Sequence, residues 1–300
     1  MPGSGKRHPG NTLNDLTGKE WLQFTRSWFT ADSKRYHRNK GTELHPARYP
    51  EEMVESFIRF FTKAGEWVLD PFLGSGATLV SCAETGRNGV GLELNPRYAA
   101  VARERIAALH WPSGTGGWVL QADARRLTWP ALWSSVPLAG CRRNPAGLPQ
   151  FDFVMTSPPY WNMLRTSRGG VKSNHQQRAE SGLDTFYSDD PADLGNIADY
   201  GLFLETLSEI LGAAAALLRP GRYLVAVVQN LRTPDGEIKT LAWDLARRLE
   251  RHPALRFQGE RIWCQNTKPL GIWGYPKLFV PNYHHHYCLI FRQTADPESP

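Results

Sequence analysis

Cysteine is scarce in this sequence, and long hydrophobic runs are absent. The 300 residues include four cysteines, at positions 82, 141, 264 and 288, and no two of them form a CxxC pair or stand at a metal-ligand spacing. The longest apolar stretch, Ile210 to Leu218, is too short to span a bilayer, and no signal peptide opens the chain. These absences exclude a disulfide scaffold and a cysteine-held metal centre. They predict a cytoplasmic protein without a membrane role.

The sequence also lacks an internal repeat. A single domain is the simplest organisation for a chain of this length and composition. Hydrophobic residues make up 41% of the chain, enough to bury one large core without help from disulfides or metals. Residues 1–12 and the tail from residue 294 are rich in Gly, Pro or charge, and we expect both to be disordered.

Positive charge is concentrated at the start of the chain. The net charge is +6, and residues 1–48 hold nine Lys and Arg against four acids. Within residues 13–44 these charges alternate with Trp21, Phe24, Trp28, Phe29 and Tyr36. Basic side chains bind phosphates and aromatic rings stack on bases, so this segment is a candidate DNA contact. A solvated surface arm with a few packing aromatics is an equally good interpretation.

From Pro50 onward the pattern alternates between strand and helix. Such alternation predicts an α/β fold with a mostly parallel sheet and helices on both faces. The expected strands lie at residues 66–70, 88–93, 118–122, 151–156, 223–229, 260–265 and 287–292. One expected helix follows the first strand and ends near Thr85. The others span residues 96–109, 200–218 and 239–250. Residues 125–150 and 161–199 are predicted to be long insertions, which in compact domains are usually functional or disordered.

A glycine-rich turn follows the first of these strands. Residues 70–78 read Asp-Pro-Phe-Leu-Gly-Ser-Gly-Ala-Thr, placed where the strand passes into a helix. Such a turn lets the backbone approach a ligand and directs free N–H groups at it. The third glycine of a dinucleotide site is replaced by Leu79, and the turn is flanked by an acid instead of basic residues. The ligand is therefore expected to carry positive charge, as the methionine part of S-adenosylmethionine does.

Two more acids follow the next two strands. Glu93 closes the second strand and is placed to accept hydrogen bonds from ribose hydroxyls. Asp123 follows the third strand and could accept from an adenine amino group. Each acid alone is more easily explained as an exposed cap or turn residue. Three acids at successive carboxyl ends, at the switch point of an open sheet, favour a binding site.

A proline-rich motif follows the fourth strand. Residues 156–160 read Thr-Ser-Pro-Pro-Tyr, and the two prolines fix the backbone and remove its donors. Local carbonyls and the Ser157 hydroxyl remain as acceptors for the N–H groups of an exocyclic amine. Such acceptors stabilise the positive charge that develops on nitrogen as a methyl group arrives. Tyr160 would stack on the base. A rigid turn with a packed tyrosine is the alternative interpretation.

Together, these motifs resemble the amino-group DNA methyltransferases of restriction-modification systems and phages. The resemblance covers roughly residues 45–292 and includes His45-Pro46-Ala47-Arg48-Tyr49-Pro50. It implies the S-adenosylmethionine-dependent methyltransferase (Rossmann-like) fold with a seven-stranded sheet. It also implies direct methyl transfer to a flipped base in DNA, with a restriction endonuclease as a functional rather than physical partner. The site residues that it implies are Tyr49, Pro50, Asp70, Pro71, Phe72, Gly74, Ser75, Gly76, Thr78, Glu93 and Asp123 for the cofactor, and Ser157, Pro158, Pro159 and Tyr160 for the base.

The target base follows from one residue. Within the resembled family, a serine opening the tetrapeptide is more typical of cytosine-N4 enzymes, and an aspartate of adenine-N6 enzymes. Ser157 therefore favours cytosine N4. Adenine N6, an RNA base and a non-catalytic DNA-binding role are the alternatives. No cysteine follows a proline, which excludes the cytosine-C5 mechanism.

The sequence departs from the commonest layout of the family in two ways. The cofactor motif has the residues found in family members in which it follows the catalytic motif along the chain. Here it precedes the catalytic motif, which indicates a circular permutation. No separate recognition domain is evident, so target recognition is expected from residues 13–44, 125–150, 161–199 or 266–286. The last of these segments is dense in aromatic residues and could equally be a packed hairpin. Its His284-His285-His286 run has no carboxylate beside it, and we predict no metal site.

Overall fold

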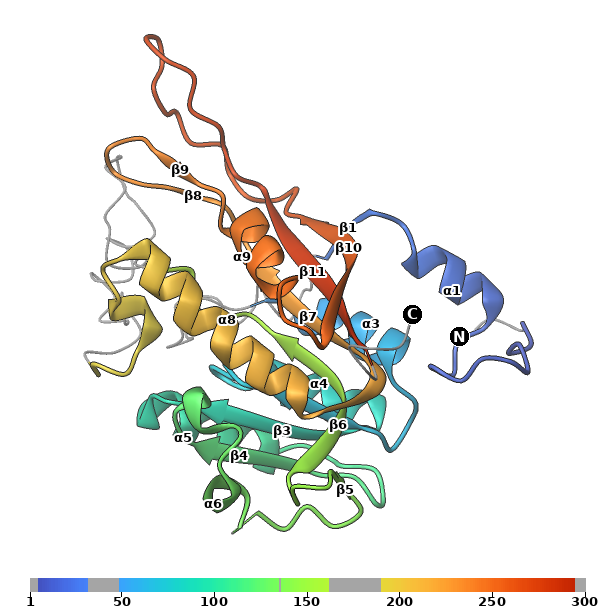
Figure 1. Ribbon diagram of the computed structural model, residues 1–300. Helices are drawn as coiled ribbons and strands as arrows, with labels where there is room; N and C mark the ends of the chain where they lie inside the picture. The colour runs from blue at the N-terminus through green and yellow to red at the C-terminus, as the bar shows by residue number, and fades with distance from the viewer. Residues whose placement is uncertain (1–4, 32–48, 135, 162–189, 295–300) are drawn as a thin grey trace.

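A mixed β-sheet runs through the protein in the computed structural model, which describes residues 5–31, 49–134, 136–161 and 190–294 (Figure 1). Seven strands follow the order β4-β3-β2-β6-β7-β11-β10, and of these only β11 is antiparallel to its neighbours. Their bounds are β2 (Trp67–Asp70), β3 (Asn88–Glu93), β4 (Gly117–Gln121), β6 (Pro149–Thr156), β7 (Leu218–Val228), β10 (Leu255–Cys264) and β11 (His285–Gln293). The expected mostly parallel sheet is confirmed, and its seven expected strands form the main part of a sheet that has nine strands among the described residues. Short strand β1 (Trp28–Thr30) extends it beyond β10, and β5 (Arg142–Arg143) pairs with the start of β6.

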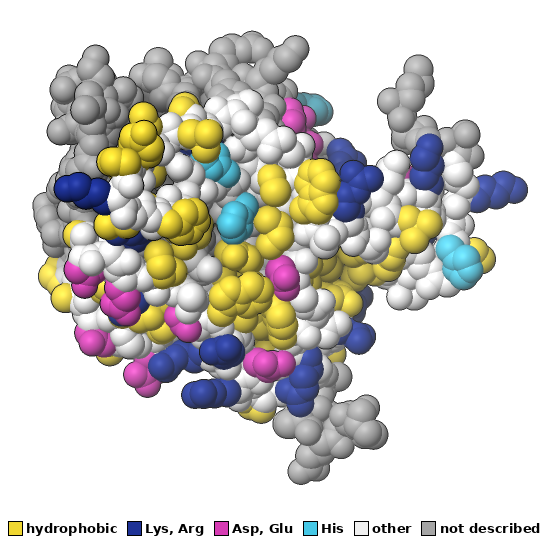
Figure 2. Space-filling view, turned by 90° about the horizontal axis from the view of Figure 1, so that it is seen from above, with side chains coloured by type: hydrophobic (Ala, Val, Ile, Leu, Met, Phe, Trp, Pro, Cys, Tyr) yellow, Lys and Arg dark blue, Asp and Glu magenta, His cyan; other side chains and the backbone are white. Residues whose placement is uncertain are grey.

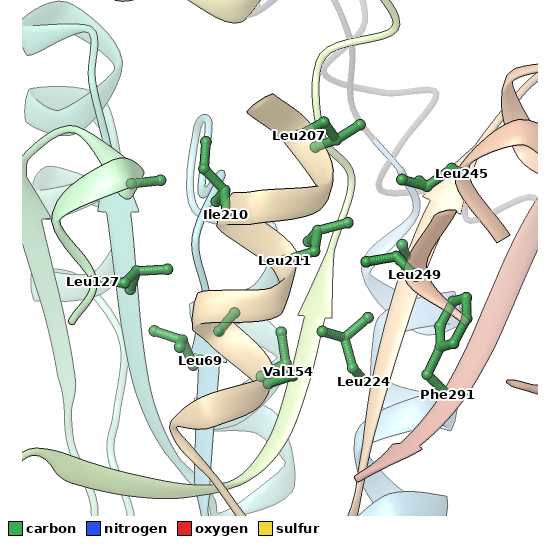
Figure 3. Packing of buried hydrophobic residues seen from close by; sticks show 14 of the residues in the cluster. Leu69, Leu127, Val154, Leu207, Ile210, Leu211, Leu224, Leu245, Leu249 and Phe291 are labelled. Carbon is green, nitrogen blue, oxygen red and sulfur yellow. The ribbon is translucent and has the colours of Figure 1, made fainter. Parts of the chain in front are cut away.

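Helices cover both faces of this sheet. On one face lie α3 (Glu51–Phe61), α4 (Ala77–Thr85) and α5 (Pro96–Ala107), and on the other lie α8 (Tyr200–Ala216) and α9 (Leu241–Leu249). The alternation of side chains along β6 shows why: Phe153 and Met155 join the core under α3, whereas Val154 joins the core under α8. Figure 3 shows this second core, in which α8 and α9 pack on the sheet.

The N-terminal segment packs against the sheet domain. Helix α1 (Gly18–Phe24) begins with a capping box between Thr17 and Glu20. Its Phe24 ring stacks on Phe60 of α3 at 3.9 Å between centroids, and the guanidinium of Arg261 lies 4.0 Å above Phe24. Trp21 and Phe29 pack beside them, so these three aromatics are partly buried against the core under α3. Trp28 is 52% exposed, and Tyr36 lies outside the described residues.

The predicted insertions have different outcomes. Residues 125–150 were expected to be one long loop, but they contain α6 (Pro130–Trp133) and β5, with the Trp133 side chain buried. Most of the second insertion, residues 162–189, lies outside the described part of the chain. Its end forms η2 (Leu194–Asn196), as Ala124–Arg126 forms η1 after β4. A small hairpin, β8 (Leu231–Arg232) and β9 (Ile238–Lys239), precedes α9. None of the helices in the described ranges is long and apolar enough to cross a membrane.

Candidate active site

A cleft lies at the carboxyl ends of β2, β3, β4 and β6, with about 610 Å³ of empty space that includes open solvent. Parallel strands bring their carboxyl ends to one edge, which is where open α/β sheets bind ligands. Seven of the predicted site residues line the cleft: Pro71, Phe72, Gly74, Glu93, Asp123, Ser157 and Pro159. The predicted residues that do not line it are Tyr49, Pro50, Asp70, Ser75, Gly76, Thr78, Pro158 and Tyr160. His45 to Arg48 lie outside the described residues.

Asp70 is fully buried and joins four parts of the site. Its carboxylate accepts hydrogen bonds from the hydroxyls of Thr156 at 2.6 Å, Thr78 at 2.5 Å and Tyr49 at 3.2 Å, and from the Phe72 N–H at 3.0 Å. Burial raises the pKa of Asp70, and these hydrogen bonds oppose that shift. A contact between Asp70 and the cofactor stays a prediction, and the observed hydrogen bonds give this residue a positioning role. It fixes the ends of β2 and β6, and the start of α4, relative to one another.

The glycine turn brings α4 close to its neighbours. Gly74 and Gly76 have φ angles of 57° and 93°, in the left-handed region that favours glycine. A Cβ atom on Gly76 would lie 3.2 Å from the Cβ of Ala102 on α5. Ser75 points toward α5, where Arg105 donates a hydrogen bond to its carbonyl at 2.5 Å and pairs with Glu51. We infer that Gly76 and Ser75 shape the turn. Of the two glycines, Gly74 lines the cleft and Gly76 does not.

Glu93 faces the cleft from the end of β3. One carboxylate oxygen accepts from the Gly74 N–H and the other from the Asn95 N–H, both at 2.8 Å. Burial raises the pKa of Glu93 to about 7 despite these two bonds. A carboxylate has further lone pairs, so Glu93 can also accept hydroxyl donors of a ligand.

Asp123 also lines the cleft, but it already has a partner. Its carboxylate accepts from the Arg125 N–H at 2.9 Å, which caps η1, and forms an ion pair with the Arg125 guanidinium at 2.8 Å. A ligand amino group would share this carboxylate with Arg125. Asp193, which was not among the predicted site residues, is a buried acid that caps η2 and lines the same cleft. An Asp in a capping position within the acidic half of the insertion was the only available signal.

The lining chemistry fits S-adenosylmethionine. Among the described residues, three carboxylates line the cleft and no Lys or Arg does so. A phosphate-bearing ligand would call for basic groups, whereas a sulfonium, an ammonium and ribose hydroxyls suit acidic acceptors. Phe72, Leu92 and Leu94 supply an apolar wall for a flat base.

The catalytic motif lies at the same edge. Ser157 Oγ and Tyr160 Oη form a hydrogen bond of 3.1 Å, and Tyr160 is only 9% exposed. The Tyr160 ring lies 6.0 Å from His286, which stacks on Trp263 at 4.7 Å. Burial lowers the pKa of His286 to about 3, so this imidazole is neutral. Among the described residues, its buried Nδ1 has no hydrogen-bond partner.

His284 and His285, which precede His286 in the sequence, contact other groups. The His284 ring contacts the carbonyls of Asn282 and Lys268, and the His285 ring packs edge-on against Tyr287. Within the described ranges, no group of three acids, histidines or cysteines is placed to hold a metal ion.

Comparison with known proteins finds local similarity to DNA methylases. A sequence profile described as DNA methylase matches residues 7–104, which include the glycine turn and Glu93. The chain is 34% identical over 87 residues to Type II methyltransferase M.MthZI of Methanothermobacter thermautotrophicus, covering 29% of this chain and 24% of that protein. It is 45% identical over 62 residues to Type II methyltransferase M.Cfr9I of Citrobacter freundii, covering 21% of each.

These matches are local, and the chain spans about a quarter of the length of the relatives it matches. A crystal structure of TrmN from Thermus thermophilus overlaps 88% of this chain and 54% of its own, with 17% identity and a TM-score of 0.49. So low a score supports no further statement. The profile match and the Type II relatives agree with the resemblance of the motifs: over about its first third, the chain is similar to the amino-group (N6/N4) DNA methylases.

Proposed function

We propose that this protein transfers a methyl group from S-adenosylmethionine to an exocyclic amino group of a base in DNA. The observation that carries the proposal is the shared cleft. Ser157 and Pro159 of the catalytic motif line the same space as Gly74 and Glu93 of the cofactor motif. The hydrogen bond between Thr156 and Asp70 supports it, because this bond joins the two motifs 86 residues apart in sequence.

In this proposal some residues bind the cofactor, and others stabilise the charge that develops on the target amine. The cofactor supplies an electrophilic methyl group. Glu93 accepts the ribose hydroxyls, and the Gly74 turn borders the methionine part. Ser157 accepts an N–H of the target amine and stabilises the charge that develops on nitrogen. The Tyr160 hydroxyl holds Ser157 in place. No strong base is needed, because the amine proton leaves once nitrogen carries the methyl group.

The finer proposal is cytosine N4 as the target. It depends on Ser157, the residue that is more typical of cytosine enzymes in the family. Adenine N6 is the alternative. Residues 13–44, 125–150, 161–199 and 266–286 are the proposed sources of target recognition, and a restriction endonuclease is the proposed functional partner.

Methylation in a living host tests both parts of the proposal. The protein and its Ser157→Ala variant are expressed in a host lacking DNA methylation, and the DNA is sequenced by a method that separates 4-methylcytosine from 6-methyladenine. We expect 4-methylcytosine at one short sequence with the natural protein and almost none with the variant. 6-Methyladenine would overturn the cytosine assignment alone, and unmodified DNA from both strains would overturn the enzymatic proposal.

A further inference from the structure

The connection between β10 and β11 forms an arm, residues 265–284, that projects beyond the rest of the molecule (Figure 1). Five hydrophobic side chains near its tip are exposed: Leu270 by 78%, Ile272 by 86%, Tyr275 by 82%, Leu278 by 59% and Phe279 by 89%. Single exposed apolar residues are common on proteins, but five of them within ten positions mark an interaction site.

The arm is braced from within, although it lacks helix and strand. Asn282 accepts from the Gly271 N–H at 2.9 Å and from the Trp273 indole at 3.1 Å, and its amide donates to the Gly271 carbonyl at 2.9 Å. Nearer the root, Lys268 donates to the Tyr283 carbonyl at 2.8 Å. These bonds hold the two sides of the arm together, so its apolar tip is presented on a defined support.

The charge of the arm favours a polyanion as its partner. Between Ile262 and Ala295 the sequence contains no Asp or Glu, whereas the arm carries Lys268 and Lys277. The arm combines an apolar tip with positive side chains and has no negative ones. Such a surface is complementary to duplex DNA, whose stacked bases are apolar and whose backbone is anionic.

The root of the arm adjoins the catalytic motif. Gln229, directly after β7, donates to the His285 carbonyl at 2.7 Å, and the ring of His286 lies 6.0 Å from that of Tyr160. Seen from the end toward which the arm points, hydrophobic and histidine side chains lie together near the middle of the surface (Figure 2). DNA that contacts the root of the arm would therefore lie over the site proposed for the target base.

We propose that the tip of this arm inserts into duplex DNA beside the target base and fills the space that the base leaves when it is extruded. This inference rests on the proposed function. An amine within a base pair is out of reach of the cleft, and unstacking costs a few kcal/mol per step. Ile272 and Phe279, the two most exposed apolar side chains of the tip, are the wedge residues.

The test compares paired and unpaired targets. Two 25-base-pair duplexes carry the sequence found methylated in the host, one with the target base normally paired and one with it opposite an abasic site. The tip variant is Ile272→Ser/Phe279→Ser. One control, Ile272→Leu/Phe279→Leu, keeps the tip apolar, and another, Leu202→Ser, removes an apolar side chain that is 54% exposed on α8.

We expect kcat/KM of the tip variant to fall at least tenfold on the paired duplex and to stay within twofold on the abasic duplex. Both controls should match the natural protein on both substrates. Equal loss on both duplexes, or no loss on either, would overturn the wedge while leaving the proposed function in place. So would a dimer of the natural protein in sedimentation that the tip variant dissociates, because the tip would then bind a second copy. Inactivity of the natural protein on both duplexes would remove the proposed function and the wedge together.

Discussion

At the scale of single residues, Glu93 gives the cofactor site a pH dependence. Burial raises its pKa to about 7 from an ordinary value of 4.5. A folded-state pKa above the unfolded value stabilises the protein most at low pH, and this contribution disappears as the pH rises through 7. We therefore expect the melting temperature of the ligand-free protein to fall between pH 5 and pH 8. A Glu93→Gln variant should show a smaller fall in a thermal scan.

Cofactor affinity should change in the opposite direction. The ionised carboxylate accepts the ribose hydroxyls, so S-adenosylmethionine should bind more tightly as the pH rises from 6 to 8. In Glu93→Gln we expect affinity to fall about tenfold, in line with the loss of one charge-assisted hydrogen bond, and the pH dependence to flatten. Calorimetry at several pH values measures both effects. An unchanged affinity in the variant would rule out Glu93 as a cofactor ligand.

Ser157 should act on transfer without affecting the cofactor. Removing a hydroxyl that accepts from the reacting amine is expected to lower kcat about 100-fold for Ser157→Ala, while the Kd for S-adenosylmethionine stays within twofold. Tyr160→Phe keeps the ring and the Ser157 hydroxyl and removes the bond between them, so its loss should be smaller. Single-turnover transfer and calorimetry separate the two effects. A Ser157→Ala enzyme of normal rate would show that the hydroxyl has no part in the reaction.

At the scale of elements, Asp70 ties strands and a helix into one unit. Replacing it with Asn leaves an amide N–H₂ against hydroxyl donors in a fully buried position. We expect Asp70→Asn to lower the free energy of unfolding by about 3 kcal/mol. Ser208→Ala on α8, which removes only bonds to carbonyls of its own helix, is a control that should cost less than about 0.5 kcal/mol. Urea unfolding compares them, and equal values would contradict the role of Asp70.

At the scale of the whole molecule, the sequence predicted the sheet well because strands such as 66–70 and 151–156 are buried on both faces and bounded by turns. It also predicted seven residues that line the cleft, since each follows a strand. It could not predict the hydrogen-bond partners of Asp70, because Thr78, Tyr49 and Thr156 meet this carboxylate only in three dimensions. Nor could it predict the position of His286 beside Tyr160, which depends on the pairing of β11 with β7.

The N-terminal segment shows the same limit, and it yields a stability prediction. Composition suggested a DNA contact in residues 13–44, which stays a prediction, but it did not show that Phe24 packs against Phe60 of α3 and Arg261 of β10. Phe24→Ala should lower the free energy of unfolding by about 2 kcal/mol, less than for a fully buried ring because Phe24 is half-buried. Leu22→Ala on the same helix, at a side chain 73% exposed, should cost less than about 0.5 kcal/mol. Denaturant titration distinguishes them, and equal stabilities would mean that α1 does not contribute to the core.

DNA affinity provides the second readout: if Phe24→Ala weakened DNA binding at a temperature where it remains folded, the ring would have to leave its place on α3 to reach a base.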